Sequence, residues 1–425
     1  MILNYGDGSE KRKERIVSNK LFSMKHLIIR SIGPIDEADI TLKRINVIIG
    51  PQSLGKSTAL KLASYCTWVE KRIELKQSPS EFIEGDGFIR QLETFHKMKG
   101  YFREDSYLSY ESEYMSFSYK YSQNKFSFVW GEKRWDYQRP KISYVPAERN
   151  LVAAIPNWFE VSLEKNNIRN FMAEWESARR SLSDRVPVLN LNIDYSFEKE
   201  SKTDRVIIQN GSALDLTYAS SGLQSLIPLF VQMTYLYTGI YDSEKGRKIA
   251  GDWADEELAD ILYMDLFVEK GRTKAEHVLE IEDSDGQKKR RFVRFAKHYG
   301  SHPYYFSNRS DVHDLDNVLS QYSLTNHCEV FLEEPENNLF PPTQKKLVDW
   351  LYEMTMGDRS NTLFIATHSP YVLSSLLEKN EKDFAFFYNS LNDGRVIVKT
   401  ASEEDCQTIF DYGVDAFFNL QNLGE

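Results

Sequence analysis

Cysteine is scarce in this chain, and its three cysteines, Cys66, Cys328 and Cys406, lie far apart. Their spacing matches neither a metal-binding motif nor a disulfide framework, so we expect reduced thiols in a reducing compartment, the cytoplasm. Long apolar runs are missing too, since none approaches the roughly 18 residues that a membrane span needs. We therefore expect neither membrane insertion nor a signal peptide.

Positive charge is not in excess either. The formal net charge of −10 gives no overall basic footprint, which argues against general DNA binding but leaves room for a local patch. Residues 151–185 have a helical, charged pattern without a sustained heptad repeat, which excludes the long coiled coil of a DNA tether. The 425 residues are enough for one large domain with insertions, or for two lobes.

The most informative segment that is present is residues 50–58. It fits the phosphate-binding pattern G-x-x-x-x-G-K-[ST] without a mismatch. The apolar, β-branched run Ile45–Ile49 before it predicts a buried strand, and residues 57–63 after it predict a helix. An ordinary glycine-rich turn is the alternative, but the strand, loop and helix together favour binding of a nucleoside triphosphate.

Each part of this loop has an expected role. Its glycines let successive backbone N–H groups and the helix N-terminus face the phosphates. Lys56 is expected to reach the β- and γ-phosphates, and the Ser57 hydroxyl is expected to ligate Mg²⁺. The nucleotide-binding candidates are Gly50, Pro51, Gln52, Ser53, Leu54, Gly55, Lys56, Ser57 and Thr58.

Two acidic residues follow a second predicted strand, Cys328–Leu332. Glu333 is expected to hold the metal, usually through water, and Glu334 to orient or deprotonate the attacking water. The alternative is a surface charge pair at a strand end. The proline-bracketed loop at residues 335–342 makes that alternative less probable than an ordered catalytic turn.

A third apolar run, Thr362–Thr367, ends at His368. A histidine at such a strand tip can contact a γ-phosphate, although a lone histidine is more often structural. In series after the phosphate loop and the two acids, it looks like the switch histidine of an ABC-type ATPase. That class also needs a signature loop, and residues 219–225 fit it, with Ser221 and Gly222 completing the site of another subunit in trans. The alternative there is a simple helix cap, since serine favours that position.

With these elements in this order, the chain resembles the ABC-type AAA ATPases of the overcoming-lysogenization-defect (OLD) group, relatives of the SMC and double-strand-break-repair ATPases. The resemblance covers most of residues 24–390. It rests on Glu-Glu-Pro-Glu-x-x-Leu-x-Pro at 333–341, Ala-Thr-His-Ser-Pro at 366–370, and Tyr-Val-Pro-Ala-Glu-Arg at 144–149. Two positions depart from the transporter ATPases: Ala147 replaces the Q-loop glutamine, and Leu223 replaces the second signature glycine.

The resemblance implies an α/β fold, that of a P-loop NTPase of ABC-ATPase type, with an antiparallel β-lobe and helical insertions. It implies ATP and Mg²⁺ as cofactors, and a dimer of heads, at least, that sandwiches two nucleotides. Arg30 and Ser31, after the first strand, are weaker candidates for nucleotide contacts. Nuclease members carry a Toprim domain after the histidine strand, but the stretch from His368 onward is too short for one, so we expect no nuclease site.

The pattern along the chain divides it into several parts. Alternating aromatic and polar residues at 114–130 predict antiparallel strands around a turn at Asn124. The cluster Lys288–Arg291 is compatible with nucleic-acid phosphates, although a solvated face, or charges that protect an edge strand from aggregation, is favoured.

We expect a disordered tail at 1–23, the N-terminal part of the head with its β-lobe at 24–150, a helical and β insertion at 151–210, the signature region at 211–235, an insertion for partner or oligomer contacts at 236–325, and the C-terminal part of the head at 326–425.

The leading functional hypothesis is an ATP-hydrolysing, self-associating head that controls a separate effector protein, a toxin or a nuclease, as in the resembling ATPases of bacterial anti-phage defence. One alternative is a nucleotide-gated scaffold that holds such an effector with little turnover. Another is a DNA-repair ATPase, which the acidic charge and the missing long arms make less favoured. A transporter ATPase is less favoured still, because the Q-loop glutamine is absent.

Overall fold

The computed structural model describes residues 24–155, 163–182, 185–242, 253–273, 278–282, 286, 288–292, 295–299, 302–379 and 381–413. The expected disordered tail at 1–23 lies outside these residues.

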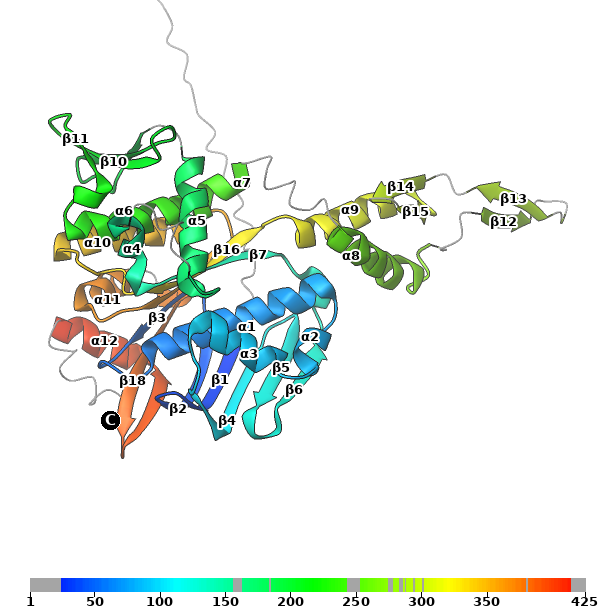
Figure 1. Cartoon of the computed structure of the whole chain (residues 1–425). Helices are drawn as coiled ribbons and strands as arrows, with labels where there is room; N and C mark the ends of the chain where they lie inside the picture. Colours follow the sequence, from blue (N-terminus) through cyan, green and yellow to red (C-terminus); the bar gives the residue numbers. More distant parts are fainter. Residues whose placement is uncertain are drawn as a thin grey trace, which may run out of the picture.

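A large mixed sheet forms the body of the molecule (Figure 1). Its strands are β1 (Lys25–Ile32), β2 (Ile35–Leu42), β3 (Ile45–Ile49), β4 (Phe102–Glu111), β5 (Met115–Lys120), β6 (Lys125–Trp130), β7 (Pro140–Val145), β16 (His327–Glu333), β17 (Thr362–Ala366), β18 (Phe384–Asn392) and β19 (Arg395–Thr400). Their order in space is β6-β5-β4-β1-β2-β19-β18-β3-β17-β16-β7. Neighbours from β18 to β7 run parallel, whereas β6 to β2 pair antiparallel.

Helices cover both faces of this sheet. One face carries α1 (Lys56–Lys76), α2 (Ser80–Ile83) and α3 (Gly87–His96), and the other carries α4 (Leu151–Ala154), α5 (Asn167–Ser181), α6 (Ser221–Thr234), α10 (Pro341–Thr355), α11 (Pro370–Leu377) and α12 (Glu403–Tyr412). After α6 the chain continues through a π-helical turn at Tyr235–Gly239 into α7 (Ile240–Asp242). No described helix combines the length and the apolar character that crossing a bilayer requires.

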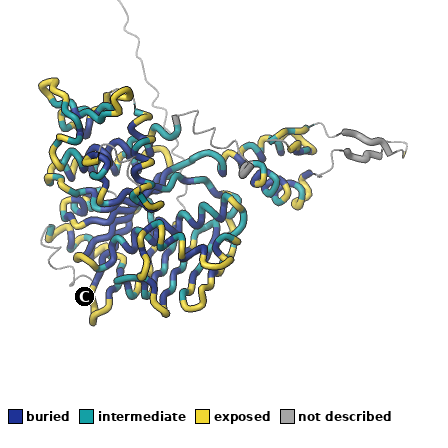
Figure 2. Tube along the Cα trace, viewed as in Figure 1, coloured by how far each residue is buried: buried dark blue, intermediate teal, exposed yellow. Residues whose placement is uncertain are grey.

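Two hydrophobic cores result, one on each face. Alternate residues of β3 enter different cores: Val47 packs with the helices of the α6 side, and Ile48 packs with those of the α1 side. Because both faces are covered, every residue of β3 is buried, as its continuous apolar run predicts. Figure 2 shows the buried central strands and the exposed outer loops.

A small sheet precedes α6 in the chain. It consists of β8 (Val186–Pro187), β9 (Ile193–Glu198), β10 (Thr203–Ile208) and β11 (Ala213–Asp215), in the order β11-β10-β9-β8. Arg179 of α5 forms an ion pair with Asp204 of β10, 2.7 Å apart, which joins this sheet to the helical layer.

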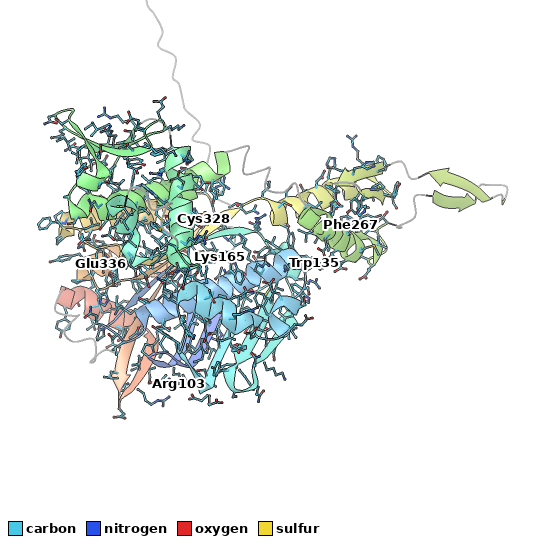
Figure 3. The ribbon with its side chains drawn as sticks, viewed as in Figure 1. Arg103, Trp135, Lys165, Phe267, Cys328 and Glu336 are labelled. Atoms are coloured by element: carbon cyan, nitrogen blue, oxygen red, sulfur yellow. The ribbon has the colours of Figure 1, made fainter. Side chains whose placement is uncertain are left out.

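The predicted insertion at 236–325 forms an arm that projects from one end of the body (Figure 1). Its described elements are α8 (Trp253–Tyr263), a π-helical turn at Met264–Val268, β12 (Val278–Glu282), β13 (Lys288–Phe292), β14 (Phe295–Tyr299), β15 (His302–Phe306) and α9 (Arg309–Ser323). The arm has its own apolar core, which includes Phe267 and Phe306 and extends to Tyr137 of the body. Figure 3 shows Phe267 in the arm and Trp135 at its base.

The basic cluster predicted at Lys288–Arg291 lies in the hairpin of β12 and β13. In the strand register, Lys288 is opposite Glu282 and Arg290 is opposite Glu280. Acidic and basic positions therefore face each other across this hairpin, away from the central sheet.

The predicted α/β fold is confirmed: in the large mixed sheet, β17 lies between the phosphate-loop strand β3 and the strand β16 that ends in the acids. Strand β3 has the predicted bounds, and the predicted antiparallel strands β5 and β6 meet at Asn124, whose φ is 44°. The expected antiparallel β-lobe is present and joins the central sheet without a break. Because β1 pairs with both β2 and β4, its strands extend the central sheet continuously.

Candidate functional site

The phosphate loop connects the end of β3 to the start of α1. Its backbone has left-handed φ values at Ser53 (63°) and Gly55 (90°). A Cβ at Gly55 would stand 2.6 Å from Cγ1 of Ile35, and one at Gly50 would stand 2.9 Å from Cβ of Asn389. Only glycine fits both places, so the loop can curl closely around an anion.

Lys56, the first residue of α1, is buried at 5% exposure. Its ammonium donates hydrogen bonds of 2.7 Å to the carbonyls of Gly50 and Pro51, and it forms no ion pair within the described residues. Burial lowers the pKa of Lys56 to about 8, although Glu334 and Glu336 act in the opposite direction. A buried cation without an ionic partner, inside a curled glycine loop, is a fitting site for a phosphate group.

Glu333 is the last residue of β16, and its side chain is buried. The Tyr144 hydroxyl donates to one carboxylate oxygen at 2.7 Å, and the backbone N–H of Ala147 donates to the other at 3.3 Å. These donors fix the direction of the carboxylate. In the part of the chain that the structure describes, no cation pairs with Glu333, and this fits a residue that holds a metal ion.

Glu334 and His368 lie at the ends of two adjacent parallel strands, β16 and β17. The Glu334 N–H donates to the carbonyl of Ala366 at 2.8 Å, and the backbone of Glu334 has a left-handed φ of 42°. Nε2 of His368 is 3.7 Å from the nearer carboxylate oxygen of Glu334. The backbone N–H of His368 donates to Glu336 at 2.7 Å, which fixes the strand tip.

Electrostatics keep His368 neutral. Its pKa is lowered first by burial and then by the nearby charge of Lys56, and Glu334 offsets this only in part. Nε2 of His368 lies 3.7 Å from Glu334, and Lys56 begins the helix that follows the neighbouring strand β3, so the three groups lie at the carboxyl ends of adjacent parallel strands. A neutral imidazole can donate a hydrogen bond from one ring nitrogen while the other accepts.

Arg149 is a component of this region whose role sequence reasoning did not identify. It is fully buried at 0% exposure. Its guanidinium donates to the carbonyls of Glu333 (2.9 Å) and Glu334 (2.7 Å), and its Nε donates to the carbonyl of Ser225 on α6 (3.2 Å). Arg149 thus joins the acidic turn to the helix that follows the signature loop. In the sequence, Arg149 stood out only as part of the family motif at 144–149, and no contact was predicted for its side chain.

The predicted signature residues begin α6. Ser221 is exposed, and a Cβ at Gly222 would stand 3.0 Å from the carbonyl oxygen of Asn338. The Asn338 amide donates to the Ser225 hydroxyl at 2.8 Å, so the start of α6 lies against the loop after the acids. Ser220 occupies the N-cap position but makes no side-chain capping bond. The simple helix-cap alternative is therefore not supported.

A second residue that the sequence did not indicate supports the phosphate loop from β18. The Asn389 amide donates to the carbonyl of Leu54, and its side chain lies directly behind Gly50. Asn389 is separated from the loop by more than three hundred residues. No local pattern predicts this contact, because it depends on the parallel pairing of β18 with β3.

Arg30 and Ser31 lie near the turn between β1 and β2. The Arg30 guanidinium is 5.8 Å from the ring centroid of Tyr107, and the Ser31 hydroxyl donates to Asp105. The same turn packs on the phosphate loop through Ile35, which is close to Gly55. Nucleotide contacts by Arg30 and Ser31 stay a prediction.

No family model matches the chain, and no curated protein matches it. Similar solved structures include the SMC head domain from Thermotoga maritima, which is 9% identical, with a TM-score of 0.40, over 89% of this chain and 99% of that chain. The recombination mediator protein RecF of the RecFOR pathway is 10% identical, with a TM-score of 0.29, over 89% of this chain and 98% of that chain. An ATP-binding cassette of an ABC transporter in its ADP conformation is 8% identical, with a TM-score of 0.30, over 95% of this chain and all of that one. At these scores the likeness carries no information about activity, substrate or partner.

Proposed function

We propose that this protein binds and hydrolyses ATP at a site that two copies of the chain share. The observation that carries the proposal is the convergence of Lys56, Glu333, Glu334 and His368 around the glycine loop at the carboxyl ends of parallel strands. Ligands bind at this edge in open α/β sheets. A buried lysine, a fixed carboxylate and a neutral histidine are the groups that phosphoryl transfer to water requires.

The residues divide the task. Lys56 and backbone N–H groups of the glycine loop bind the β- and γ-phosphates, and these donors are in place before the reaction. Ser57 and Glu333 would hold Mg²⁺, and the bound ion would neutralise part of the phosphate charge. Glu334 orients the attacking water and accepts its proton, and His368 donates a hydrogen bond to a γ-phosphate oxygen.

The shared site is the second part of the proposal. Among the described residues, no hydrogen bond joins the signature residues 219–222 to the phosphate loop of the same chain. Ser221 is exposed, and so are two large aromatic side chains in adjoining loops, Tyr218 at 81% and Phe340 at 74%. Exposed aromatic residues beside an exposed signature loop are typical of a surface that another protein covers. A second copy supplies Ser221 and Gly222 to the γ-phosphate across that surface.

The finer proposal is that the nucleotide state controls a separate effector protein, a toxin or a nuclease, in anti-phage defence. It rests on the motif resemblance at 333–341, 366–370 and 144–149. The projecting arm, which has its own core, offers a surface for such an effector without disturbing the nucleotide site.

The test is multiple-turnover ATP hydrolysis by the purified chain over a range of protein concentrations, with and without DNA. We expect the rate per subunit to rise with concentration, and Lys56→Ala to abolish ATP binding at the phosphate loop. A rate per subunit independent of concentration would contradict the shared site. Tight ATP binding without turnover in any condition would contradict hydrolysis and favour the nucleotide-gated scaffold. Strong stimulation by DNA would favour the repair-type alternative.

A further inference from the structure

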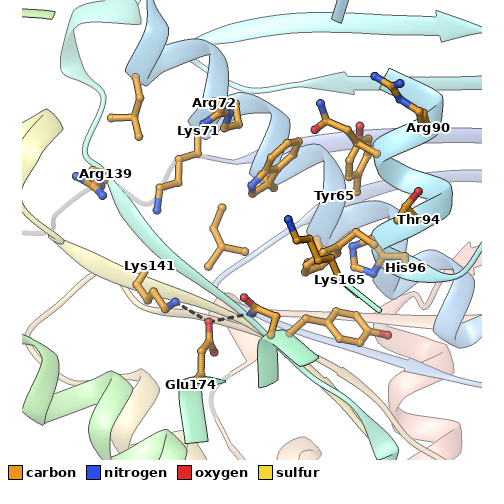
Figure 4. A pocket seen from close by; sticks show the side chains of 18 residues that line it. Tyr65, Lys71, Arg72, Arg90, Thr94, His96, Arg139, Lys141, Lys165 and Glu174 are labelled. Atoms are coloured by element: carbon orange, nitrogen blue, oxygen red, sulfur yellow. Dashed lines mark hydrogen bonds and ion pairs between the residues drawn. The ribbon is translucent and has the colours of Figure 1, made fainter. Parts of the chain in front are cut away.

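A second cavity lies away from the phosphate loop, between α1, α3, β7 and the start of α5 (Figure 4). Its volume is about 700 Å³, and none of residues 50–58 lines it. Cavities of roughly 300–1,000 Å³ are typical of sites for small ligands. The cavity is therefore large enough for a ligand of its own.

Basic side chains dominate the polar lining of this cavity. They are Lys71, Arg72, Arg90, Arg139, Lys141 and Lys165, whereas Glu174 is the one carboxylate among the lining residues. Glu174 is already occupied: Lys141 donates to it at 2.5 Å, and Ser143 and Gln232 donate to its other oxygen. The excess of positive charge is therefore not neutralised by the lining residues themselves.

Lys71 lies at the centre of this charge, and Figure 4 shows it extending from α1 between Arg139 and Lys141. Its hydrogen bond to the carbonyl of Pro140, 2.7 Å long, involves no anion. Burial first, and then the charges of Arg139 and Lys141, lower its pKa to about 7. Lys141 is paired with Glu174, and Lys71 is charged only in part near pH 7, so an anion here would favour the charged form of Lys71 and pair with Arg139.

The rest of the lining is aromatic. Trp68 stacks on Tyr65 with ring centroids 5.6 Å apart, and Phe95 and His96 form an edge contact at 4.9 Å. Flat faces and edges of this kind accept another planar ring by stacking. The cavity thus combines cations for an anionic group with aromatic surfaces for a ring.

We propose that this cavity binds a nucleotide, with its phosphate at Lys71, Arg139 and Lys141 and its base against the aromatic side chains. A nucleoside monophosphate carries both chemical parts and is the simplest member of this class. An anion without a ring would leave the aromatic surface unused, and an uncharged aromatic molecule would leave the cations unneutralised.

The cavity is also connected to the hydrolytic site, an inference that rests on the function proposed above. Tyr144 lines the cavity, and its hydroxyl is the donor that fixes Glu333. The ring of His96 meets that of Tyr144 edge-on at 5.1 Å. On another wall, Glu174 accepts from Gln232 of α6, the helix that the signature loop begins. A nucleotide here would therefore bias both the metal-holding carboxylate and the signature helix.

Binding is tested by isothermal titration calorimetry on the full chain carrying Lys56→Ala, which removes phosphate-loop binding. The probes are AMP, GMP, CMP, UMP and inorganic phosphate. We expect at least one monophosphate to bind about tenfold more tightly than phosphate, and Lys71→Met to weaken it by about tenfold or more. Lys76→Met is the matched control, because Lys76 lies on the same helix outside the cavity and should leave binding unchanged.

The proposal is overturned if no monophosphate binds, if phosphate binds equally well, or if Lys71→Met has no effect. Thr94→Trp, which fills the cavity and keeps its charges, is a second variant and should also abolish binding. The link to hydrolysis is tested separately, by adding the bound monophosphate to wild-type turnover assays. An unchanged rate would overturn the link alone. A wild-type chain without any turnover would contradict the ATPase, while calorimetry would still decide whether the cavity binds nucleotides.

Discussion

At the scale of single residues, two neighbouring carboxylates have different surroundings. Glu333 is buried and fixed by donors from Tyr144 and Ala147. Glu334 follows it in a left-handed backbone turn, with a partly exposed side chain near the neutral ring of His368. Because environment sets what a carboxylate can do, the first residue suits metal binding and the second suits handling of the attacking water.

We expect Glu334→Gln to lower kcat by about 10² to 10⁴ while ATP binding is retained, because the amide cannot accept the proton. Steady-state hydrolysis and equilibrium ATP binding measure the two quantities. Glu353→Gln, an exposed substitution on α10, is the matched control and should change neither. Turnover of Glu334→Gln at the wild-type rate would remove the catalytic role of Glu334.

Arg149 contacts backbone carbonyls and is not expected to contact the nucleotide. We therefore expect Arg149→Met, unlike Glu334→Gln, to lower stability as well as turnover. Loss of the guanidinium leaves buried carbonyls of the acidic turn without a donor, which costs about 1–3 kcal/mol of unfolding free energy for each. Chemical denaturation measures this loss. We also expect kcat to fall while KM for ATP stays near the wild-type value, because the phosphate loop keeps its own contacts. A rise in KM with kcat unchanged would contradict a role in positioning Glu334.

At the scale of elements, a buried ion cluster joins β1, α1 and β16. Lys25 donates to both carboxylate oxygens of Glu329, at 2.7 and 2.5 Å, and lies 3.7 Å from Glu70. Burial disfavours the charge of Glu329, but Lys25 and His327 together outweigh burial and bring the pKa of Glu329 down to about 2. Burial raises the pKa of Glu70, and the attraction of Lys25 lowers that pKa by less than burial raises it.

We expect Lys25→Met to lower the free energy of unfolding by about 3–5 kcal/mol at pH 7, because it leaves buried carboxylates without their cation. A carboxyl whose pKa is depressed on folding stabilises the fold above its ordinary value of 4.5 and loses this contribution as pH falls toward about 2. The difference between wild type and variant should therefore narrow below about pH 4.5. Urea denaturation across this pH range checks the sign, and a difference that widens in acid would contradict the pairing.

These elements also show how far the sequence can predict the structure. Strand β3, the helix after the loop at 50–58 and the antiparallel strands around Asn124 follow from local patterns, and their predictions are confirmed. The bond from Lys25 to Glu329 spans 304 positions in the chain and depends on how the sheet and α1 pack together. The contacts of Arg149 and Asn389 likewise depend on packing between distant segments, so no periodicity or spacing could indicate them.

At the scale of the whole molecule, the protein consists of a helix-covered sheet with a core on each face and an arm with a third core. Glu336, beside the candidate site, and Trp135, at the base of the arm, lie at different ends of the body (Figure 3). The nucleotide site and the arm are thus well separated. In the function proposed above, an effector on the arm and a second head at the signature loop would therefore not compete for one surface.

The central claim is that each site combines the phosphate loop of one chain with the signature loop of another. Lys56→Ala should disable the phosphate loop. Ser221→Arg, at an exposed position, should disable the signature loop without harming the fold. Each variant alone should lack turnover. A mixed dimer of the two, however, contains one site built from the intact phosphate loop of one chain and the intact signature loop of the other.

The most direct measurement is therefore ATP hydrolysis by an equimolar mixture of the two variants, compared with each variant alone at the same total concentration. We predict a mixture rate well above the sum of the separate rates. Addition of wild-type protein to each variant, at matched concentration, is the control for subunit exchange. If the subunits exchange and the mixture still gives only the sum of the two separate rates, the site is contained within one chain and the account of a shared site is wrong.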